Sequence, residues 1–333
     1  MANTSKGERV RSLKGSLIPP AKTTGGKDRG RSGSFKLVVS LLLGLLLAAE
    51  DLYGHAYPYK MPPPGCPCPC PSARMVIGVI REYQVQKKDT LLDIARKFDL
   101  GYNELQILYP DLDPWLPPEG MILKIPTKWV LPEFHQEGIV VNVPEMRLYL
   151  FMPRHGLVKT HPIGIGIEEY PTPLGSFRVK EKKVDPVWYV PPSLKDQYKG
   201  ITAVPPGPDN PLGRYWIGLT ASSYGIHGTN KPWGVGRLVS RGCIRMYPED
   251  IETLFPLVTI GMRVDIVYQP VKFGCDAEKI YIEVHPDLYG RIGDLFSYAL
   301  SLARSKGISE KISLPLLYKA VKERKGIPEL LTP

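Results

Sequence analysis

The stretch IHGTNKPWGVGRLVSRGCIRMYPEDIETLF, residues 226–255, places one histidine, one cysteine and several glycines close together in the chain. His227 and Cys243 lie sixteen residues apart, and Gly242 removes side-chain bulk directly beside the sulfur. The end of the stretch, 248–255, begins with proline and two acidic residues, which suit the first turn of a helix. The stretch therefore predicts an accessible thiol in a glycine-rich segment that ends in a short helix.

A thiol and an imidazole in one segment are candidates for nucleophilic catalysis. An unshifted cysteine is only a few per cent thiolate near pH 7, so it needs a nearby base. Arg241 and Arg245 flank Cys243, and a cation favours the thiolate; alternatively, Arg245 holds a substrate carboxylate by paired hydrogen bonds. The backbone N–H groups of Gly242 and Cys243 are candidates for an oxyanion hole. Because buried structural cysteines are common, the spacing alone leaves both roles open.

Residues 134–270, which surround this stretch, have a β-rich pattern. Apolar residues dominate GIVVNV at 138–143 and RLYLF at 147–151, and the intervening Pro-Glu-Met predicts a hairpin. Glycine and proline punctuate the rest, and a helix is expected only at 248–255. Further strands are expected at 176–179, 188–190, 215–219 and 262–267.

The wider pattern resembles the L,D-transpeptidase (YkuD-type) catalytic domain. That family's signature is His-Gly followed by Ser/Thr-(His/Arg)-Gly-Cys-hydrophobic-(Arg/Asn). The resemblance covers about 134–270 and implies an α+β, mainly β chain with a β-sandwich-like catalytic domain. The matching residues are His227-Gly228-Thr229, Ser240-Arg241-Gly242-Cys243-Ile244-Arg245-Met246, Thr172-Pro173-Leu174-Gly175-Ser176-Phe177, Trp188-Tyr189-Val190-Pro191-Pro192 and Asn210-Pro211-Leu212-Gly213.

The resemblance implies a mechanism and a substrate. Cys243 attacks a peptidoglycan tetrapeptide stem, His227 is the base, and the Gly228 carbonyl orients the imidazole. D-Ala leaves, and an amine of another stem (a 3→3 cross-link) or of an envelope protein resolves the thioester. The resemblance implies no metal and no cofactor. The residues expected around the oxyanion and substrate are Gly242, Arg245, Arg241 and Ser240.

Two alternatives to transpeptidation stay open: an L,D-carboxypeptidase, in which water resolves the thioester, and a non-catalytic peptidoglycan-binding protein. Many family members have a second histidine where this chain has Arg241, which leaves His227 as the base of the motif. His285 is expected to be structural, and the remaining histidines are expected in surface or loop positions. Those remaining histidines are His55, His135, His155 and His161.

Residues 81–128 predict a small β-α-α-β module. Tyr83 and Val85 alternate as in a strand, Asp89 or Thr90 can cap a first helix, and Gly120 precedes a last strand. The order resembles a LysM module, a family that binds N-acetylglucosamine-containing glycans in a groove between two loops. The glycan-binding residues that this resemblance implies are Asp89, Thr90, Leu91, Pro110 and Leu112.

The N-terminal residues 1–56 predict an export signal. The chain has a formal charge of +10, of which residues 1–49 carry +7, so the charge gives no evidence of a nucleic-acid surface. The uncharged stretch LVVSLLLGLLLAA at 37–49 is typical of a secretory signal, either cleaved or kept as a membrane anchor. The chain is therefore expected outside the cytoplasm, in the periplasm or cell envelope, with membrane contact only through this segment.

Residues 57–80 are rich in proline and predict an extended linker without packed elements. The linker cysteines are expected to pair locally, to stay free, to clip a metal or to link two chains. Cys275, just beyond the β-rich domain, is expected to be structural. The segment 271–333 predicts one more strand at 276–285 and helices within 289–305 and 313–324, which form either a helical cap or a partner surface. The linker cysteines are Cys66, Cys68 and Cys70.

Overall fold

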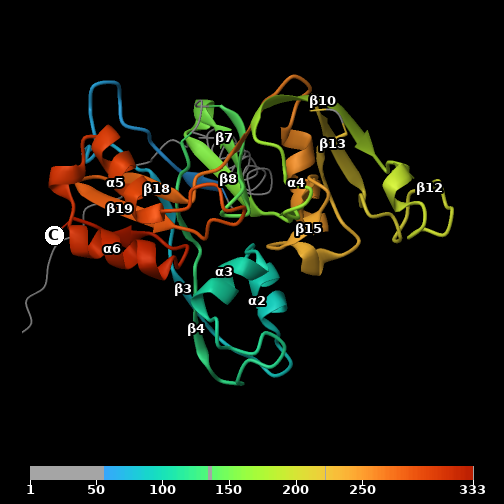
Figure 1. Cartoon of the computed structure of the whole chain (residues 1–333), viewed down its shortest axis with the longest axis horizontal. Coiled ribbons are helices and arrows are strands. Elements are labelled where there is room, and N and C mark those ends of the chain that lie inside the picture. The colour runs from blue at the N-terminus through green and yellow to red at the C-terminus, as the bar shows by residue number, and fades with distance from the viewer. Residues whose placement is uncertain (1–55, 134–136, 222, 333) are drawn as a thin grey trace, which may run out of the picture. The chain divides into compact units, whose positions relative to one another are not determined.

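The computed structural model describes residues 56–133, 137–221 and 223–332, and one mixed sheet is its largest element (Figure 1). The expected export signal at 1–56 lies outside these residues, except for Ala56. The described chain holds no helix with the length and apolar character needed to cross a bilayer. The nine strands of the sheet are, in spatial order, β1 (Ala56–Pro58), β8 (Leu157–Pro162), β7 (Arg147–Met152), β6 (Gly138–Asn142), β17 (Arg263–Val267), β10 (Gly175–Val184), β13 (Tyr215–Leu219), β14 (Gly225–His227) and β16 (Ile244–Arg245).

The central hairpin confirms the prediction made from its alternation. Strands β6 and β7 pair antiparallel, with Ile139 opposite Leu150. Ile139 and Leu150 belong to one apolar core, whereas Val140 and Tyr149 belong to another on the opposite face. Since a strand alternates its side chains between faces, a strand covered on both faces is apolar throughout.

The sheet curls, and this differs from the expected β-sandwich-like arrangement. Leu148 of β7 and Ile244 of β16 lie far apart in strand order yet share one core with Ile226 of β14. A single hydrogen-bonded sheet bends around that core, so it takes the place of two separate packed sheets. Helix α4 (Pro248–Leu254) has the predicted N-terminal proline and contributes Ile251 to the same core.

The segment 81–128 has the predicted β-α-α-β order. It contains β3 (Arg81–Gln84), α2 (Leu91–Lys97), α3 (Tyr102–Leu108) and β4 (Ile122–Ile125), and β3 pairs with β4. Thr90 caps α2 through a capping box with Asp93.

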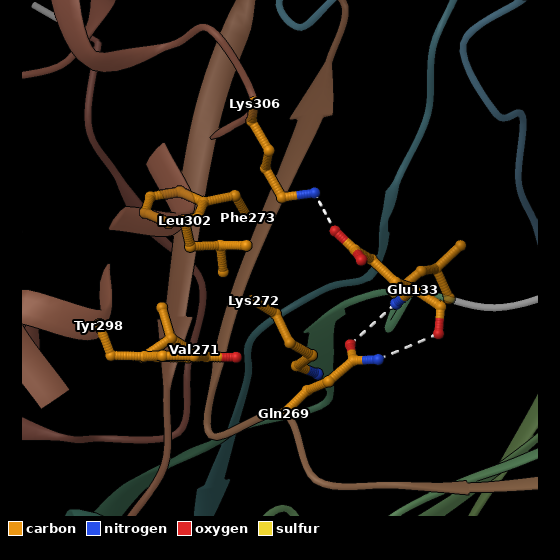
Figure 2. Close-up of a pocket in the computed structure, with 9 residues that line it drawn as sticks. Glu133, Gln269, Val271, Lys272, Phe273, Tyr298, Leu302 and Lys306 are labelled. Atoms are coloured by element: carbon orange, nitrogen blue, oxygen red, sulfur yellow. Dashed lines mark hydrogen bonds and ion pairs between the residues drawn. The ribbon is translucent and has the colours of Figure 1, made fainter. Parts of the chain in front are cut away.

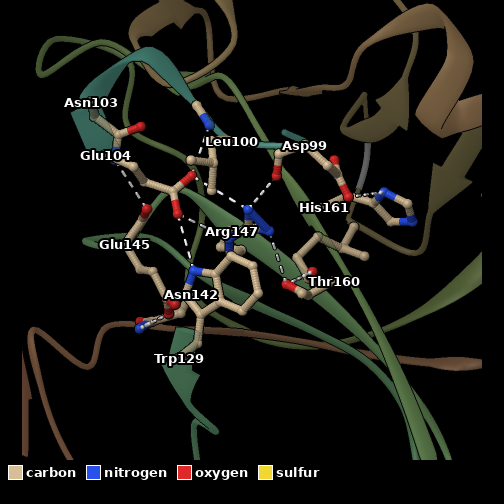
Figure 3. Close-up of polar contacts among 12 residues, drawn as sticks. Asp99, Leu100, Asn103, Glu104, Trp129, Asn142, Glu145, Arg147, Thr160 and His161 are labelled. Atoms are coloured by element: carbon tan, nitrogen blue, oxygen red, sulfur yellow. Dashed lines mark hydrogen bonds and ion pairs between the residues drawn. The ribbon is translucent and has the colours of Figure 1, made fainter. Parts of the chain in front are cut away.

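A buried ion pair ties this segment to the sheet (Figure 3). Glu104 of α3 lies 3.3 Å from the Arg147 guanidinium of β7, and it accepts a hydrogen bond from the Trp129 indole at 3.0 Å. Arg147 also donates to the Asp99 carbonyl at 2.5 Å. The side chains of Glu104 and Arg147 are both buried, so the charge of each compensates the cost of burying the other.

Residues 57–80 pack against the rest of the described chain, which corrects the expectation of an extended linker. Strand β1 pairs with β8, and β2 (Val76–Gly78) pairs with β5 (Lys128–Val130). Disulfides join Cys66 to Cys70 and Cys68 to Cys275. The second bond closes a loop of 207 residues, and such a constraint stabilises a fold mainly by restricting the unfolded chain.

The segment 271–332 combines a sheet with two helices. Strands β18 (Val271–Asp276), β19 (Lys279–Val284) and β20 (Glu329–Leu330) pair antiparallel. Figure 1 shows α5 (Leu295–Ser305) and α6 (Leu314–Glu323) beside this sheet, and their apolar residues share one core with it. The alternation at 276–285 predicts only one strand in this segment. The remaining strands are β9 (Ile165–Gly166) with β15 (Leu238–Ser240), and β11 (Trp188–Tyr189) with β12 (Ala203–Val204).

Candidate active site

Three neighbouring strands place the histidine and the cysteine of the motif together. Strand β14 pairs antiparallel with β13 and parallel with β16, so His227 lies opposite Trp216 on one side and Arg245 on the other. Cys243 immediately precedes β16, and a hydrogen bond to the Gly225 backbone lowers its pKa, although burial raises it more. The register therefore brings residues 16 positions apart in the chain to one corner of the sheet.

His227 is buried, and its ring orientation is fixed by a carbonyl. Its Nδ1 lies 2.6 Å from the Gly228 oxygen. Because a carbonyl oxygen only accepts, Nδ1 carries the proton and donates it, which leaves the Nε2 lone pair as a base. This is the contact that the resemblance implied for Gly228.

The surroundings of His227 favour its neutral form. Burial, followed by the positive charge of Arg245, lowers the pKa of His227 to about 3, although the carbonyls of Gly228 and Leu212 act in the opposite direction. At neutral pH the imidazole is therefore uncharged and can accept a proton.

Cys243 is the free cysteine among the described residues, and its side chain is half-buried. Its sulfur donates to the Ser223 carbonyl at 3.7 Å. Burial raises the pKa of the Cys243 thiol, although the Gly225 backbone and Arg245 lower it. The arginine thus acts in the direction expected from the sequence, but burial outweighs it, and the resting site holds a neutral thiol and a neutral imidazole.

Trp216 was missed in the sequence analysis, although it contacts the base directly. Its ring stacks on His227 with centroids 5.7 Å apart, and its Nε1 donates to Glu181 at 3.0 Å. A Cβ at Gly225 would lie 2.6 Å from the indole, so a glycine is required there. Trp216 in YWIGL and Gly225 in GIH indicate the stacking on His227 only once the register of β13 and β14 is known.

The turn before the cysteine is held by Ser240 and Gly242. Gly242 has φ +98°, and a Cβ there would lie 2.4 Å from the Tyr224 ring, so both conformation and space require glycine. Ser240 Oγ accepts from the Gly242 N–H at 3.1 Å and donates to the Cys243 carbonyl at 2.5 Å. The Gly242 N–H is therefore engaged, and this corrects its expected part in an oxyanion hole.

The two arginines of the motif differ. Arg241 is exposed and lies over the Tyr170 ring at 4.8 Å. Arg245 is half-buried, and its Nε has no hydrogen-bond partner within the described part of the chain. Burial lowers the pKa of Arg245, while Cys243 and Tyr198 act to raise it. Arg245 is thus a half-buried cation with an unused Nε donor, two residues after Cys243.

Sequence comparisons relate this chain to a known family. Residues 136–266 match the family model described as the L,D-transpeptidase catalytic domain, YkuD. The probable L,D-transpeptidase ErfK/SrfK of Escherichia coli is 35% identical over 257 residues, which cover 75% of this chain and 81% of that protein. This chain belongs to the L,D-transpeptidase family.

Further matches are to other L,D-transpeptidases. The probable L,D-transpeptidase YcfS of Escherichia coli is 39% identical over 211 residues, which cover 60% of this chain and 66% of that protein. Among solved structures, the catalytic domain of the Enterococcus faecium L,D-transpeptidase is 25% identical, with a TM-score of 0.33, over 41% of this chain and all of that one.

The residues expected to bind glycan lie outside the transpeptidase site, and their surroundings differ. Thr90 and Leu91 serve the fold, since Thr90 caps α2 and Leu91 is fully buried. Asp89 accepts hydrogen bonds from the Tyr83 hydroxyl at 2.7 Å and from the Gln86 N–H at 2.8 Å. Pro110 is exposed and Leu112 half-buried, so these two retain surface that a ligand can reach.

A separate pocket of this L,D-transpeptidase lies between β18 and α5 (Figure 2). Glu133 forms an ion pair with Lys306 there and exchanges hydrogen bonds with Gln269. None of the residues lining it belongs to the group around Cys243.

Proposed function

We propose that this chain is a peptidoglycan L,D-transpeptidase that uses Cys243 as its nucleophile. The observation that carries the proposal is the buried imidazole of His227, whose Nδ1 is fixed on the Gly228 carbonyl. Its strand β14 pairs with β16, and Cys243, the one free thiol of the described chain, immediately precedes β16. A base with its proton fixed on one nitrogen presents the other nitrogen to a thiol.

The acyl transfer proceeds in two halves. In the first, the Cys243 sulfur attacks the carbonyl before the terminal D-Ala of a tetrapeptide stem, and His227 Nε2 takes the thiol proton. The bond between that carbonyl and the D-Ala nitrogen breaks, and His227 returns the proton to the leaving amine. In the second half, an acceptor amine attacks the thioester and passes a proton to His227. The bond between the acyl carbon and the Cys243 sulfur breaks, and His227 returns the proton to the thiolate.

Arg245 is the charged donor of this site. Its half-buried guanidinium interacts electrostatically with Cys243 and has an unused Nε donor, as a developing oxyanion or a stem carboxylate requires. Trp216 is a positioning residue, because its stacked ring limits rotation of the imidazole. Ser240 keeps Cys243 in place through the carbonyl contact.

The segments outside the catalytic domain suggest where the enzyme acts and what it binds. We propose that residues 37–49 direct export to the periplasm or cell envelope, and that 81–128 is a LysM module that holds glycan strands near the site. An acceptor on another stem gives a 3→3 cross-link, and a lysine of an envelope protein gives a wall-attached protein.

Incubation with a disaccharide-tetrapeptide followed by mass spectrometry tests this function. Transpeptidation predicts a dimer whose mass is two substrates minus one D-Ala. Tripeptide without dimer would identify an L,D-carboxypeptidase, and unchanged substrate would indicate a non-catalytic peptidoglycan-binding protein. The Cys243→Ala variant is the matched control and is expected to give neither product.

A further inference from the structure

A second cluster of chemically reactive side chains lies where the 81–128 segment meets the sheet. Asp99 follows α2, His161 belongs to β8, and Asp250 belongs to α4. One ligand atom from each residue lies within 4.8 Å of the others. Three elements that are far apart in the chain thus converge on one point, and Figure 3 shows His161 directed at Asp99.

The polar atoms of this cluster lack hydrogen-bond partners. His161 is 5% exposed, yet neither of its ring nitrogens has a hydrogen-bond partner among the described residues. Asp99 Oδ1 and Asp250 Oδ2 also lack hydrogen-bond partners among the described residues, whereas the other oxygen of each carboxylate faces His161 Nδ1. Buried polar groups are normally satisfied, so a buried imidazole that has no hydrogen bond and lies beside two carboxylates indicates a missing ligand.

The distances within the cluster suit a metal better than a hydrogen bond. His161 Nδ1 lies 3.3 Å from an Asp250 oxygen and 3.6 Å from an Asp99 oxygen. Charge-assisted hydrogen bonds between such groups are shorter, at about 2.7–2.9 Å. Nitrogen and oxygen ligands placed about 2.0–2.2 Å from a tetrahedral zinc ion are themselves about 3.3–3.6 Å apart.

A neighbouring cluster shows what a satisfied arrangement looks like. Glu145, Glu283 and His285 also group closely, but the Lys272 ammonium lies 2.8 Å from an oxygen of each glutamate. A cation from the chain itself already fills that position. In the first cluster, Lys159 interacts with both carboxylates, so the group keeps one net negative charge when His161 is neutral.

We propose that Asp99, His161 and Asp250 bind one divalent cation of the zinc type, with a fourth position for water. Imidazole and carboxylate ligands together suit this class of ion. The site joins α2 to β8 and α4, so the cation acts as a structural clip between the 81–128 segment and the catalytic sheet. It takes no part in the chemistry at Cys243.

Zinc binding to the full chain tests the proposal. The Cys243→Ala background removes the free thiol, which is itself a zinc ligand, and equilibrium dialysis with elemental analysis then measures zinc per chain. One equivalent is expected, with a rise in Tm on zinc addition. His161→Gln and, separately, Asp250→Asn in that background are expected to weaken zinc affinity by about tenfold or more, since loss of even an outer-sphere partner costs that much.

A matched variant separates this site from adventitious binding. His155→Gln removes an exposed histidine six residues earlier and is expected to leave zinc affinity and the Tm rise unchanged. The proposal is overturned if the Cys243→Ala chain binds less than one equivalent. It is also overturned if the Asp250→Asn chain, folded by its circular dichroism, binds zinc as tightly as its parent. Neither readout depends on transpeptidase activity.

Discussion

His227 and His161 are both buried in the same sheet, but their surroundings shift their pKa values in opposite directions. Burial and the charge of Arg245 lower the pKa of His227 to about 3. Around His161 burial acts the same way, but the carboxylates of Asp99 and Asp250 outweigh it and raise the pKa of His161 to about 9. Burial lowers both pKa values, so the charges of the neighbours decide which histidine is an available base and which is a partner of fixed charges.

Replacement of His227 by glutamine is expected to give the largest effect. The amide can still donate to the Gly228 carbonyl, but it cannot accept the thiol proton. The rate of dimer formation is expected to fall about 10³-fold, within the range for loss of a general base. The Tm serves as the control and is expected to change little, so a large loss of Tm would show that His227 is mainly structural.

Replacement of His161 by glutamine, measured in chelator, is expected to reduce stability. Two carboxylates would then face each other without their positive partner, and uncompensated buried charge is costly. Because Asp99 is partly exposed, we expect a loss of about 2 kcal/mol in the free energy of unfolding, below the full cost of a broken buried pair. Denaturant unfolding measures this, and an unchanged midpoint would contradict the account.

Substitutions at Trp216 test the positioning of the base. Trp216→Leu removes the stacked ring, and kcat is expected to fall about tenfold with little change in KM, because a loosely held imidazole is less often aligned. Trp216→Phe keeps an aromatic face but loses the bond to Glu181, and a loss of about threefold is expected. Equal losses in both variants would argue against stacking as the cause.

The pH dependence of thiol alkylation tests the neutral resting pair. Burial raises the pKa of Cys243, so its thiolate fraction is small at neutral pH and increases about tenfold per pH unit below that pKa. Iodoacetamide is uncharged, and the other cysteines are in disulfides, so its rate reports on Cys243. The rate is expected to rise steadily from pH 6 to pH 8. A plateau over this range would indicate a preformed thiolate–imidazolium pair.

Local patterns were sufficient to predict the elements that pack by alternation or capping. The β6–β7 hairpin, α4 and the β-α-α-β order of 81–128 all follow from periodicity and turn residues within a few positions. The signature around His227 and Cys243 likewise stands in one continuous stretch.

Features that depend on strand register, or on contacts between segments far apart in the chain, were not predictable from the sequence. The stacking of Trp216 on His227 requires the β13–β14 register, and the burial of His161, which was expected at the surface, requires β8 to be covered on both faces. The Cys68–Cys275 bond pairs residues 207 positions apart, and cysteine spacing does not determine connectivity. This pairing leaves Cys243 free.

The identity of the acylated residue tests the central claim most directly. Intact-protein mass spectrometry after incubation with a carbapenem, followed by peptide mapping, locates the covalent bond. The account predicts one adduct per chain, on Cys243, and no adduct in the Cys243→Ala variant. An adduct that persists in that variant, or a wild-type chain that forms none, would contradict the assignment of Cys243 as the nucleophile.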